Sequence, residues 1–373
     1  MSAGVYIHIP FCRSRCSYCD FATDVWLNND AVDRYVDALC KEIKTASISR
    51  SLDVDTIYLG GGTPSLLSPH QLEQVIRSVY EKLNVEPGAE VTMEMNPATV
   101  TPTTLSAFRS LGVNRASFGV QTFNDRDLKL LARGHDANDA RRTLTMLRDA
   151  GFDNVSFDLI AGLPGQSLAD WNANLNEAIR LSPEHISLYL LEIHQGTPLA
   201  RQIRDERRPD PDPDLAAEMY ECMLDRLLGE GYEQYEISNF SRLGYASRHN
   251  SKYWMLDPVY GFGVSAHSFD GRQRYANERD TAKYVQLVSN TGSAEILRED
   301  IDISSEFVFL GLRMENGITL SAYRERFGSD LTTTHGQSIK MLTEAELIAL
   351  DGDNLRLTRK GKLYSNEVFA EFV

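Results

Sequence analysis

The sequence has no long apolar run and is short of basic residues. Because no stretch of about 18 uninterrupted apolar residues occurs, we expect no membrane-spanning helix, and the first residues do not have a signal-peptide layout. Fifty-three acidic residues against 38 lysines and arginines give a net charge of −15, which opposes non-specific binding to nucleic acid or to anionic membranes. We therefore expect a cytoplasmic protein with no transmembrane segment and no nucleic-acid partner.

Cysteine is also scarce, with five residues in the chain, yet three of them lie close together near the amino terminus. An odd count with such a cluster fits a reducing compartment and a metal or redox site better than a disulfide framework. The other two, Cys40 and Cys222, lie among apolar residues at helical spacing. We expect both to pack in the core.

The length and composition are those of a globular protein with more than one domain. A chain of 373 residues is too long for one small core and allows two or three domains. The hydrophobic fraction of 42% and the aromatic fraction of 9% are ordinary for such proteins. No internal repeat and no low-complexity segment is present.

Strand-like and helix-like segments alternate in the first half of the chain. Residues 70–83 and 138–151 have helical spacing. The alternation predicts parallel strands joined by crossover helices, and six units are too few for a closed eight-stranded barrel. An α/β fold with an open sheet or a partial barrel follows. The strands are expected at residues 4–9, 55–60, 90–95, 115–121, 154–160 and 185–193.

Within these strands, polar and apolar side chains alternate. In residues 90–95, for example, three apolar side chains take one face and Thr92 and Glu94 take the other. If the apolar sets face the helices, the polar sets share one interior surface. Polar side chains on successive strands of an α/β fold usually mark a site at the carboxyl ends of the strands. The expected members of this surface are Tyr6, His8, Glu94, Gln121 and Asp158.

The pattern changes in the second half, where we expect a smaller domain. Residues 204–214 are charged and rich in proline, which indicates an exposed connection, and a helix is expected at about 214–229. The acidic surroundings disfavour a DNA-binding wing. The predicted division is a core at residues 1–235 and a mostly helical C-terminal domain at 236–373, made of a linking segment at 236–290 and a winged-helix-like end at 291–373.

Three cysteines form a C-x3-C-x2-C loop directly after the first predicted strand. Structural zinc takes four ligands, and the nearby fourth candidate is His8. A redox pair of Cys16 and Cys19 leaves Cys12 without a role. An iron–sulfur cluster with four irons normally takes four thiolates, so three would leave one iron open to a small molecule. The residues alone leave all three interpretations open.

The cysteine spacing, with Tyr18 before the last cysteine, resembles that of the radical S-adenosylmethionine (SAM) superfamily. The segments "GGGTP", "EMNP", "GVQTF", "ARGH" and "DLIAGLPGQ" agree with this resemblance. It implies a partial (β/α)6 barrel as the core, with a [4Fe-4S] cluster on Cys12, Cys16 and Cys19 and SAM on the open iron. The SAM contacts that it implies are Tyr6, Gly61, Gly62, Thr63, Glu94, Gln121, Arg133 and Asp158.

The resemblance also implies roles for these residues. The glycine turn would approach the methionyl amino group, Glu94 would pair with ribose hydroxyls or with the ammonium group, and Arg133 suits the SAM carboxylate. The implied chemistry is transfer of one electron from the cluster to the sulfonium, which gives a 5′-deoxyadenosyl radical. A flavodoxin- or ferredoxin-like donor is therefore expected, and the resemblance also allows a dimer.

Segments along nearly the whole chain resemble the branch that contains oxygen-independent coproporphyrinogen III oxidase and haem chaperones. The oxidases carry a further cysteine two residues after the third, where this chain has Phe21, and an amino-terminal extension, whereas eleven residues precede Cys12 here. Both differences favour a chaperone that delivers haem to acceptor haemoproteins over an oxidase that decarboxylates porphyrinogen propionates. A radical SAM methyltransferase or a haem-degrading relative has no specific support.

The segment "HNSKYW", residues 249–254, resembles an H-N-x-x-Y-W pattern of the haem-chaperone group. Imidazole is a common axial ligand of haem iron, so His249 is expected to contact haem, with His267 as the rival ligand. The ordinary alternative is a hydrogen-bonded histidine beside two packing aromatics. The segment "GVSAHS" lacks the proline-glycine that is usual before "AHS" in this group. The local backbone conformation is therefore expected to differ there from that of the group.

Overall fold

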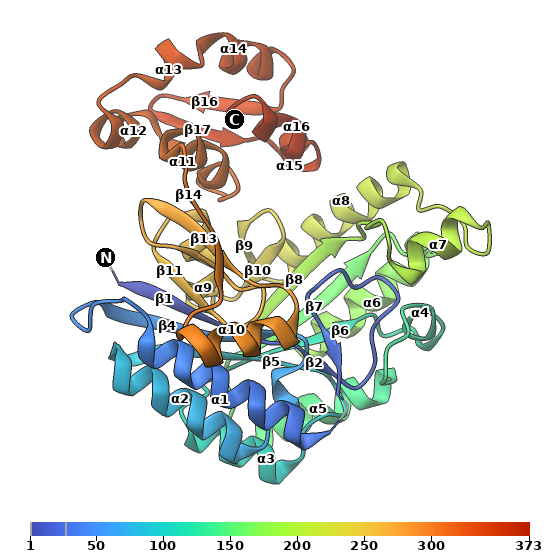
Figure 1. Ribbon diagram of the computed structural model, residues 1–373. Helices are drawn as coiled ribbons and strands as arrows, with labels where there is room; N and C mark the ends of the chain where they lie inside the picture. The colour runs from blue at the N-terminus through green and yellow to red at the C-terminus, as the bar shows by residue number, and fades with distance from the viewer. Residues whose placement is uncertain (1, 27) are drawn as a thin grey trace.

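A twelve-stranded mixed sheet forms the centre of the computed structural model, which describes residues 2–26 and 28–373 (Figure 1). Its seven central strands, from β11 to β8, are parallel, and the strands at both edges are antiparallel. The order across the sheet is β14 (Glu295–Asp300), β13 (Gln273–Asn277), β12 (His267–Phe269), β11 (Val259–Phe262), β1 (Ala3–Ile9), β4 (Asp53–Gly61), β5 (Asn84–Met95), β6 (Arg115–Gln121), β7 (Val155–Ala161), β8 (His185–Leu190), β10 (Asn239–Ser241) and β9 (Glu233–Glu236).

The six strands predicted in the first half are confirmed as β1 and β4 to β8. They are consecutive neighbours in the sheet and parallel throughout. The sheet does not close on itself, because β1 pairs with β11 and β8 pairs with β10 instead of with each other. The predicted α/β fold with a partial barrel is confirmed.

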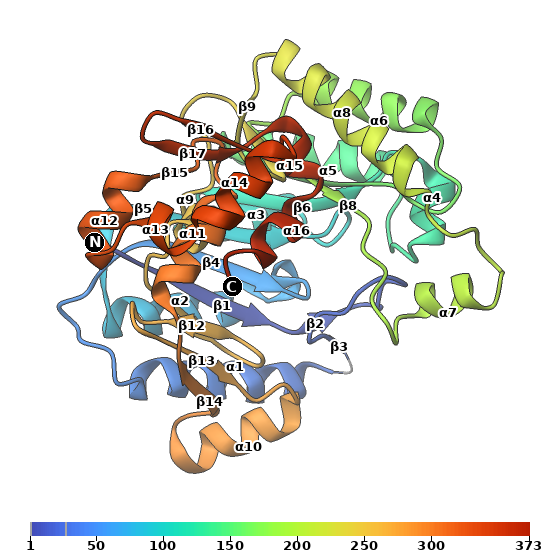
Figure 2. The ribbon, with the colours of Figure 1, turned by 90° about the horizontal axis from the view of Figure 1, so that it is seen from above.

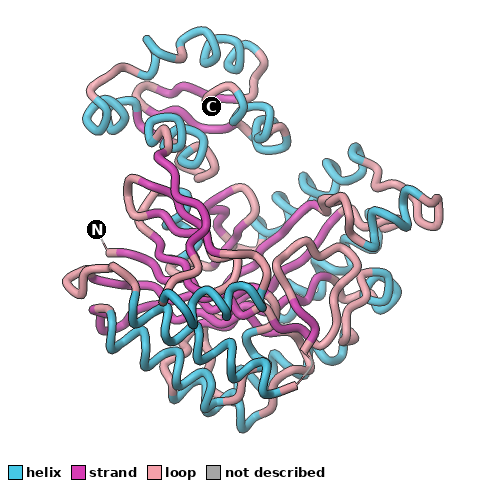
Figure 3. The backbone as a smooth tube through the Cα atoms, in the orientation of Figure 1, coloured by secondary structure: helices cyan, strands magenta, loops and turns pink. Residues whose placement is uncertain are grey.

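Helices cover the outer side of the strands, as the cyan and magenta segments of Figure 3 show. Several begin at a residue whose side chain caps the helix, such as Ser68, Asp136 and Ser167, each in a reciprocal capping box. The helices of this part are α1 (Asn29–Thr45), α2 (Pro69–Lys82), α3 (Pro102–Ser110), α4 (Asp125–Leu130), α5 (Ala137–Asp149), α6 (Leu168–Leu181), α7 (Pro198–Arg204), α8 (Pro213–Gly229) and α10 (Thr281–Thr291). A further helix, α9 (Arg248–Trp254), contributes Asn250 to the interior cavity instead.

The apolar face of each strand packs against these helices, as the alternation predicted. Val91, Phe157 and Leu159 belong to one buried core with residues of α1, α2 and α6. Cys40 and Cys222 pack against the same core, which confirms their predicted place. The polar faces of the strands are therefore left to line the interior of the partial barrel.

Residues 236–300 extend both edges of the large sheet. β10 pairs with β8 and is followed outward by β9, and β11 pairs with β1 and is followed outward by β12, β13 and β14, so the sheet runs across the predicted boundary at residue 235. These strands have three to six residues and, apart from the parallel pairing of β11 with β1, antiparallel neighbours, which is why the segment lacks the strand–helix alternation of the first half.

The C-terminal unit has its own core and lies at one end of the molecule, shown in red in Figures 1 and 2. Its three-stranded sheet has the order β15-β17-β16, and β16 and β17 form a hairpin beside the helices. The predicted mostly helical end with a winged-helix-like hairpin is confirmed. Its elements are α11 (Ile303–Gly311), β15 (Ile318–Thr319), α12 (Leu320–Phe327), α13 (Leu331–Thr334), α14 (Gly336–Glu344), β16 (Ile348–Asp351), β17 (Asn354–Leu357), α15 (Arg359–Leu363) and α16 (Ser365–Ala370).

Within residues 2–26 and 28–373, every helix is too short or too polar to cross a lipid bilayer.

Candidate functional site

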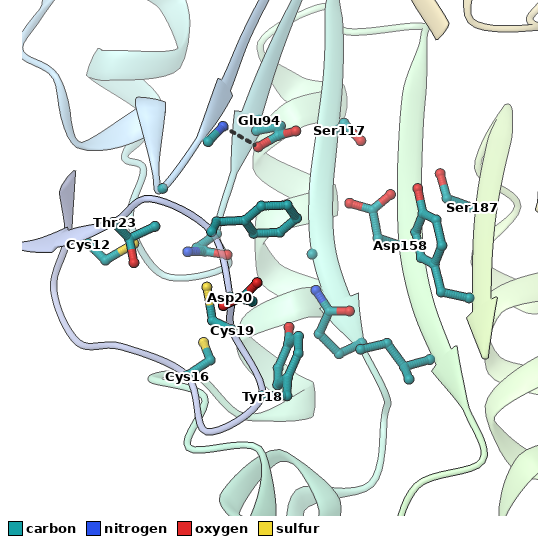
Figure 4. Close-up of a pocket in the computed structure, with 18 of the residues that line it drawn as sticks. Cys12, Cys16, Tyr18, Cys19, Asp20, Thr23, Glu94, Ser117, Asp158 and Ser187 are labelled. Atoms are coloured by element: carbon teal, nitrogen blue, oxygen red, sulfur yellow. Dashed lines mark hydrogen bonds between the residues drawn. The ribbon is translucent and has the colours of Figure 1, made fainter. Parts of the chain in front are cut away.

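A cavity of about 520 Å³ lies inside the partial barrel and reaches the cysteine loop. It brings together most of the predicted site residues, from six different elements and loops (Figure 4). Thr63 lies beside it in an adjoining pocket, and Tyr6, outside the cavity lining, stacks on the lining residue Tyr58 with ring centroids 6.2 Å apart. The predicted residues that line the cavity are Cys12, Cys16, Cys19, Gly61, Gly62, Glu94, Gln121, Arg133 and Asp158.

The three cysteines lie on one loop that leaves β2 (Phe11–Cys12) and returns to β3 (Asp24–Val25), as Figure 4 shows. Ser17 fixes the middle of this loop, because its backbone N–H and its hydroxyl donate to the carbonyls of Leu131 and Leu130, at the end of α4, at 3.0 and 2.9 Å. Burial raises the pKa of the Cys12 thiol, while Thr63 donates a hydrogen bond to its Sγ at 3.6 Å. All three thiols are free and line the cavity.

Among the described residues, no three His, Cys, Asp or Glu side chains converge closely enough to bind a single metal ion. His8, the fourth zinc ligand considered above, has both ring nitrogens in hydrogen bonds. Its Nε2 lies 2.9 Å from the carbonyl of Ala22, and its Nδ1 lies 3.0 Å from the Tyr6 hydroxyl. Because a carbonyl can only accept, Nε2 carries the proton and Nδ1 accepts from Tyr6. His8 therefore ties β1 to the returning cysteine loop.

The glycine turn after β4 passes very close to β1. A Cβ atom at Gly61 would lie 2.6 Å from Cε1 of His8, and one at Gly62 would lie 2.7 Å from the backbone of Pro10. Gly61 also has a φ of +111°, which side chains disfavour. Its N–H donates to Oε2 of Glu94 at 3.1 Å. The backbone of the turn therefore faces the cavity without side chains, next to the carboxylate of Glu94.

We expect Gly61→Ala to destabilise the protein by about 2 kcal/mol, because the new methyl group would collide with His8 in a strained backbone conformation. SAM affinity should fall as well. Thermal unfolding and a SAM titration would measure both effects. The matched control is Gly229→Ala, since a Cβ atom there meets nothing within 4 Å. Equal stability of the two variants would contradict this account of the turn.

Two carboxylates face the same interior space. Tyr58 donates to Oε1 of Glu94 at 2.8 Å. Burial, together with repulsion from Asp158, raises the pKa of Glu94 to about 7. Burial also raises the pKa of Asp158, although the positive charges of Arg115 and Arg133 act to lower it. Paired buried carboxylates favour a ligand that brings positive charge or hydroxyl donors, and the ammonium and ribose groups of SAM supply both.

Arg133 links the cysteine loop to the ends of the strands. Its Nη2 donates to Oδ1 of Asn96 at 2.5 Å and to the carbonyl of Gly119 at 2.8 Å, and its Nη1 lies 3.4 Å from Sγ of Cys16. Its Nε is buried without a partner. Gln121, at the end of β6, adopts a left-handed φ of +64° beside it. A fixed guanidinium with a free donor fits the carboxylate of SAM.

His249 lies on α9, outside the cavity lining. It is 1% exposed, and its Nδ1 and Nε2 lie 2.9 Å from Thr56 Oγ1 and 3.2 Å from the Tyr253 hydroxyl. Burial lowers its pKa to about 3, so the ring is neutral. His267, at the start of β12, is exposed. Binding of haem iron by His249 stays a prediction, and it requires the ring to leave one of its two partners.

Several residues that line the cavity were not predicted from the sequence. Tyr58 alternates with Ile57 and Leu59, so its place on the polar face could have been found from the spacing. Arg115 opens its strand, where a charged residue usually marks a solvated strand end. The missed lining residues include Tyr58, Asn96, Arg115, Ser117, Ser187, Tyr189, His194 and Asn250.

The chain matches the model of the Radical SAM superfamily over residues 6–178 and the model of the HemN C-terminal domain over residues 299–364. The structure of coproporphyrinogen III oxidase (HemN) from Escherichia coli, a radical SAM enzyme, superimposes with a TM-score of 0.89 at 25% identity. That alignment covers 100% of this chain and 90% of the oxidase. Fold and motifs thus define the radical SAM class.

Among curated proteins, heme chaperone HemW of Bacillus subtilis (strain 168) is 36% identical over 99% of both chains. The mitochondrial radical S-adenosyl methionine domain-containing protein 1 of Bos taurus is 35% identical over 96% of this chain and 84% of its own. The chain therefore belongs to the radical SAM superfamily, in its HemW-like branch.

Proposed function

We propose that this protein binds haem and delivers it to acceptor haemoproteins, and that its radical SAM core holds a [4Fe-4S] cluster and SAM. The main support is the similarity along almost the entire chain to proteins named heme chaperone HemW. Phe21 is a second support. It lines the cavity with 67% of its surface exposed, at the position where the oxidases are expected to have a further cysteine.

The residues around the cavity suit both cofactors. Cys12, Cys16 and Cys19 would hold the cluster, which supplies the electron for SAM cleavage when a flavodoxin- or ferredoxin-like donor reduces it. Arg133 would hold the SAM carboxylate, and Glu94 would accept hydrogen bonds from its ribose or ammonium group. The remaining SAM contacts that we propose are Tyr6, Gly61, Gly62, Thr63, Gln121 and Asp158.

SAM affinity should depend on pH through Glu94, whose pKa is raised to about 7. Donors on SAM stabilise the ionised carboxylate, so affinity should be full above about pH 8. It should fall by up to about tenfold per unit as the pH drops below 7. Equilibrium binding across this range checks the result. Glu94→Gln should bind SAM weakly with no such dependence, and an unchanged pH profile in that variant would exclude Glu94 as the titrating group.

A haem titration tests the proposed function and the choice of ligand. We expect anaerobically reconstituted wild type to bind about one haem per chain, with a saturable Soret band. His249→Ala and His267→Ala, measured side by side, identify the axial ligand by loss or shift of that band. His70→Ala is the control, because His70 is exposed and lies outside both cavity linings. Absence of saturable binding in wild type would contradict the proposal.

The second candidate is the oxygen-independent oxidase, which the close superposition on the Escherichia coli enzyme favours. It requires conversion of coproporphyrinogen III to protoporphyrinogen IX without oxygen, in the presence of SAM and a reductant. We expect no such conversion.

A further inference from the structure

Arg115 is a buried cation at the start of β6. Its side chain is 1% exposed, yet it lines the cavity. Its Nε and Nη2 atoms are buried without hydrogen-bond partners, and within the described residues it forms no salt bridge. Guanidinium stays protonated in proteins. A buried charge without a close partner is unfavourable, so this side chain is suited to an anionic ligand group.

Arg115 enters the cavity from a different level of β6 than the place assigned to the SAM carboxylate. Arg115, Ser117, Gly119 and Gln121 share one face of β6 because side chains alternate along a strand. Arg133 bonds to the carbonyl of Gly119, four residues beyond Arg115. At about 3.3 Å of rise per residue, the backbone positions of Arg115 and Gly119 differ by about 13 Å along the strand. The Arg115 side chain therefore leaves β6 at a different level from the carbonyl that Arg133 contacts, although both side chains line the same cavity.

The neighbours of Arg115 define the class of anion. Ser117 and Asn250 line the same cavity, and their hydroxyl and amide groups can donate to an oxyanion. Asp158 lies close enough for its charge to interact with Arg115, and Glu94 lies close to Asp158. These carboxylates oppose a dianion such as phosphate. A single carboxylate matches both the one positive charge and the planar fork of the guanidinium.

We propose that Arg115, Ser117 and Asn250 form a carboxylate-binding subsite at the inner end of the cavity, for a ligand that lies next to the SAM residues. Haem carries two propionate groups, so haem is one possible source of the carboxylate, and this source rests on the proposed function. The other possible source is a small molecule with a carboxylate group. The subsite itself depends on neither.

Propionate is the probe for the subsite, measured by NMR on the anaerobically reconstituted protein. Wild type should bind propionate at least tenfold more tightly than the neutral propionamide. Arg115→Met should lose this preference, Arg115→Lys should keep part of it, and Arg142→Met, on the exposed face of α5, should keep all of it. Thermal unfolding and cluster absorbance verify that each variant is folded and loaded.

Equal binding of propionate and propionamide by wild type overturns the subsite even if Arg115→Met fails to fold. A preference that survives in folded Arg115→Met overturns it as well. A second titration compares haem with haem dimethyl ester. A preference for haem that disappears in Arg115→Met identifies a haem propionate as the ligand group. Equal affinities, with the propionate preference intact, assign the subsite to a small carboxylate ligand. Failure of haem binding alone would count against the proposed function and not against the subsite.

Discussion

Replacing Cys12, Cys16 or Cys19 with alanine is expected to abolish the iron–sulfur cluster. Each thiolate would hold a different iron, and three ligands leave no spare for a cluster with one open corner. The loop offers no substitute, because the nearby His8 has both nitrogens in hydrogen bonds. Iron and sulfide content and the visible absorbance after anaerobic reconstitution should fall close to zero. SAM binding should fall with them.

Cys40→Ala and Cys222→Ala are the matched controls for the cluster. Both residues pack against the core on helices, away from the cavity lining. These variants should retain full iron and sulfide. A normal cluster in Cys16→Ala would show that the loop does not hold it as proposed.

Arg133→Met should lower SAM affinity by about tenfold to a hundredfold, which corresponds to the loss of about 1.5–3 kcal/mol from a charge-assisted hydrogen bond. The side chain spans Asn96, Gly119 and Cys16, so the substitution also loosens the contact between the cysteine loop and β6. Calorimetric titration of the reconstituted protein with SAM measures the effect.

Arg142→Met is the control for Arg133→Met, because Arg142 is an exposed arginine that pairs with Asp139 on α5. Its SAM affinity should equal that of wild type. Arg133→Lys should recover part of the affinity through its charge but without the planar fork. Wild-type SAM affinity in Arg133→Met would remove this residue from the SAM site.

Much of the fold could be predicted because the strands of the first half alternate so regularly. A period of two determines which side chains share a face, so Glu94 and Asp158 could be placed on one interior surface before the structure was known. The glycine turn and the cysteine loop could be recognised because their residue types and spacing are specific. These features depend on local sequence alone.

The burial of individual side chains and the contacts between segments far apart in the chain could not be predicted in this way. The spacing in "HNSKYW" does not reveal that the His249 ring lies between Thr56, almost two hundred residues earlier, and Tyr253. The short antiparallel strands after residue 236 have no periodic pattern to detect. Arg115 opens its strand, where a charged residue usually marks a solvated end, yet it is 1% exposed and lines the cavity.

Haem transfer is the most direct test of the central claim. Anaerobically reconstituted protein, loaded with haem and freed of excess by gel filtration, is mixed with the apo form of a b-type cytochrome, and the Soret spectrum is followed in time. We predict that the spectrum of the loaded protein is replaced by that of the holo-cytochrome, and that wild type without haem causes no change. If the loaded protein retains no haem after gel filtration, or if its haem never reaches the cytochrome, the chaperone account is wrong.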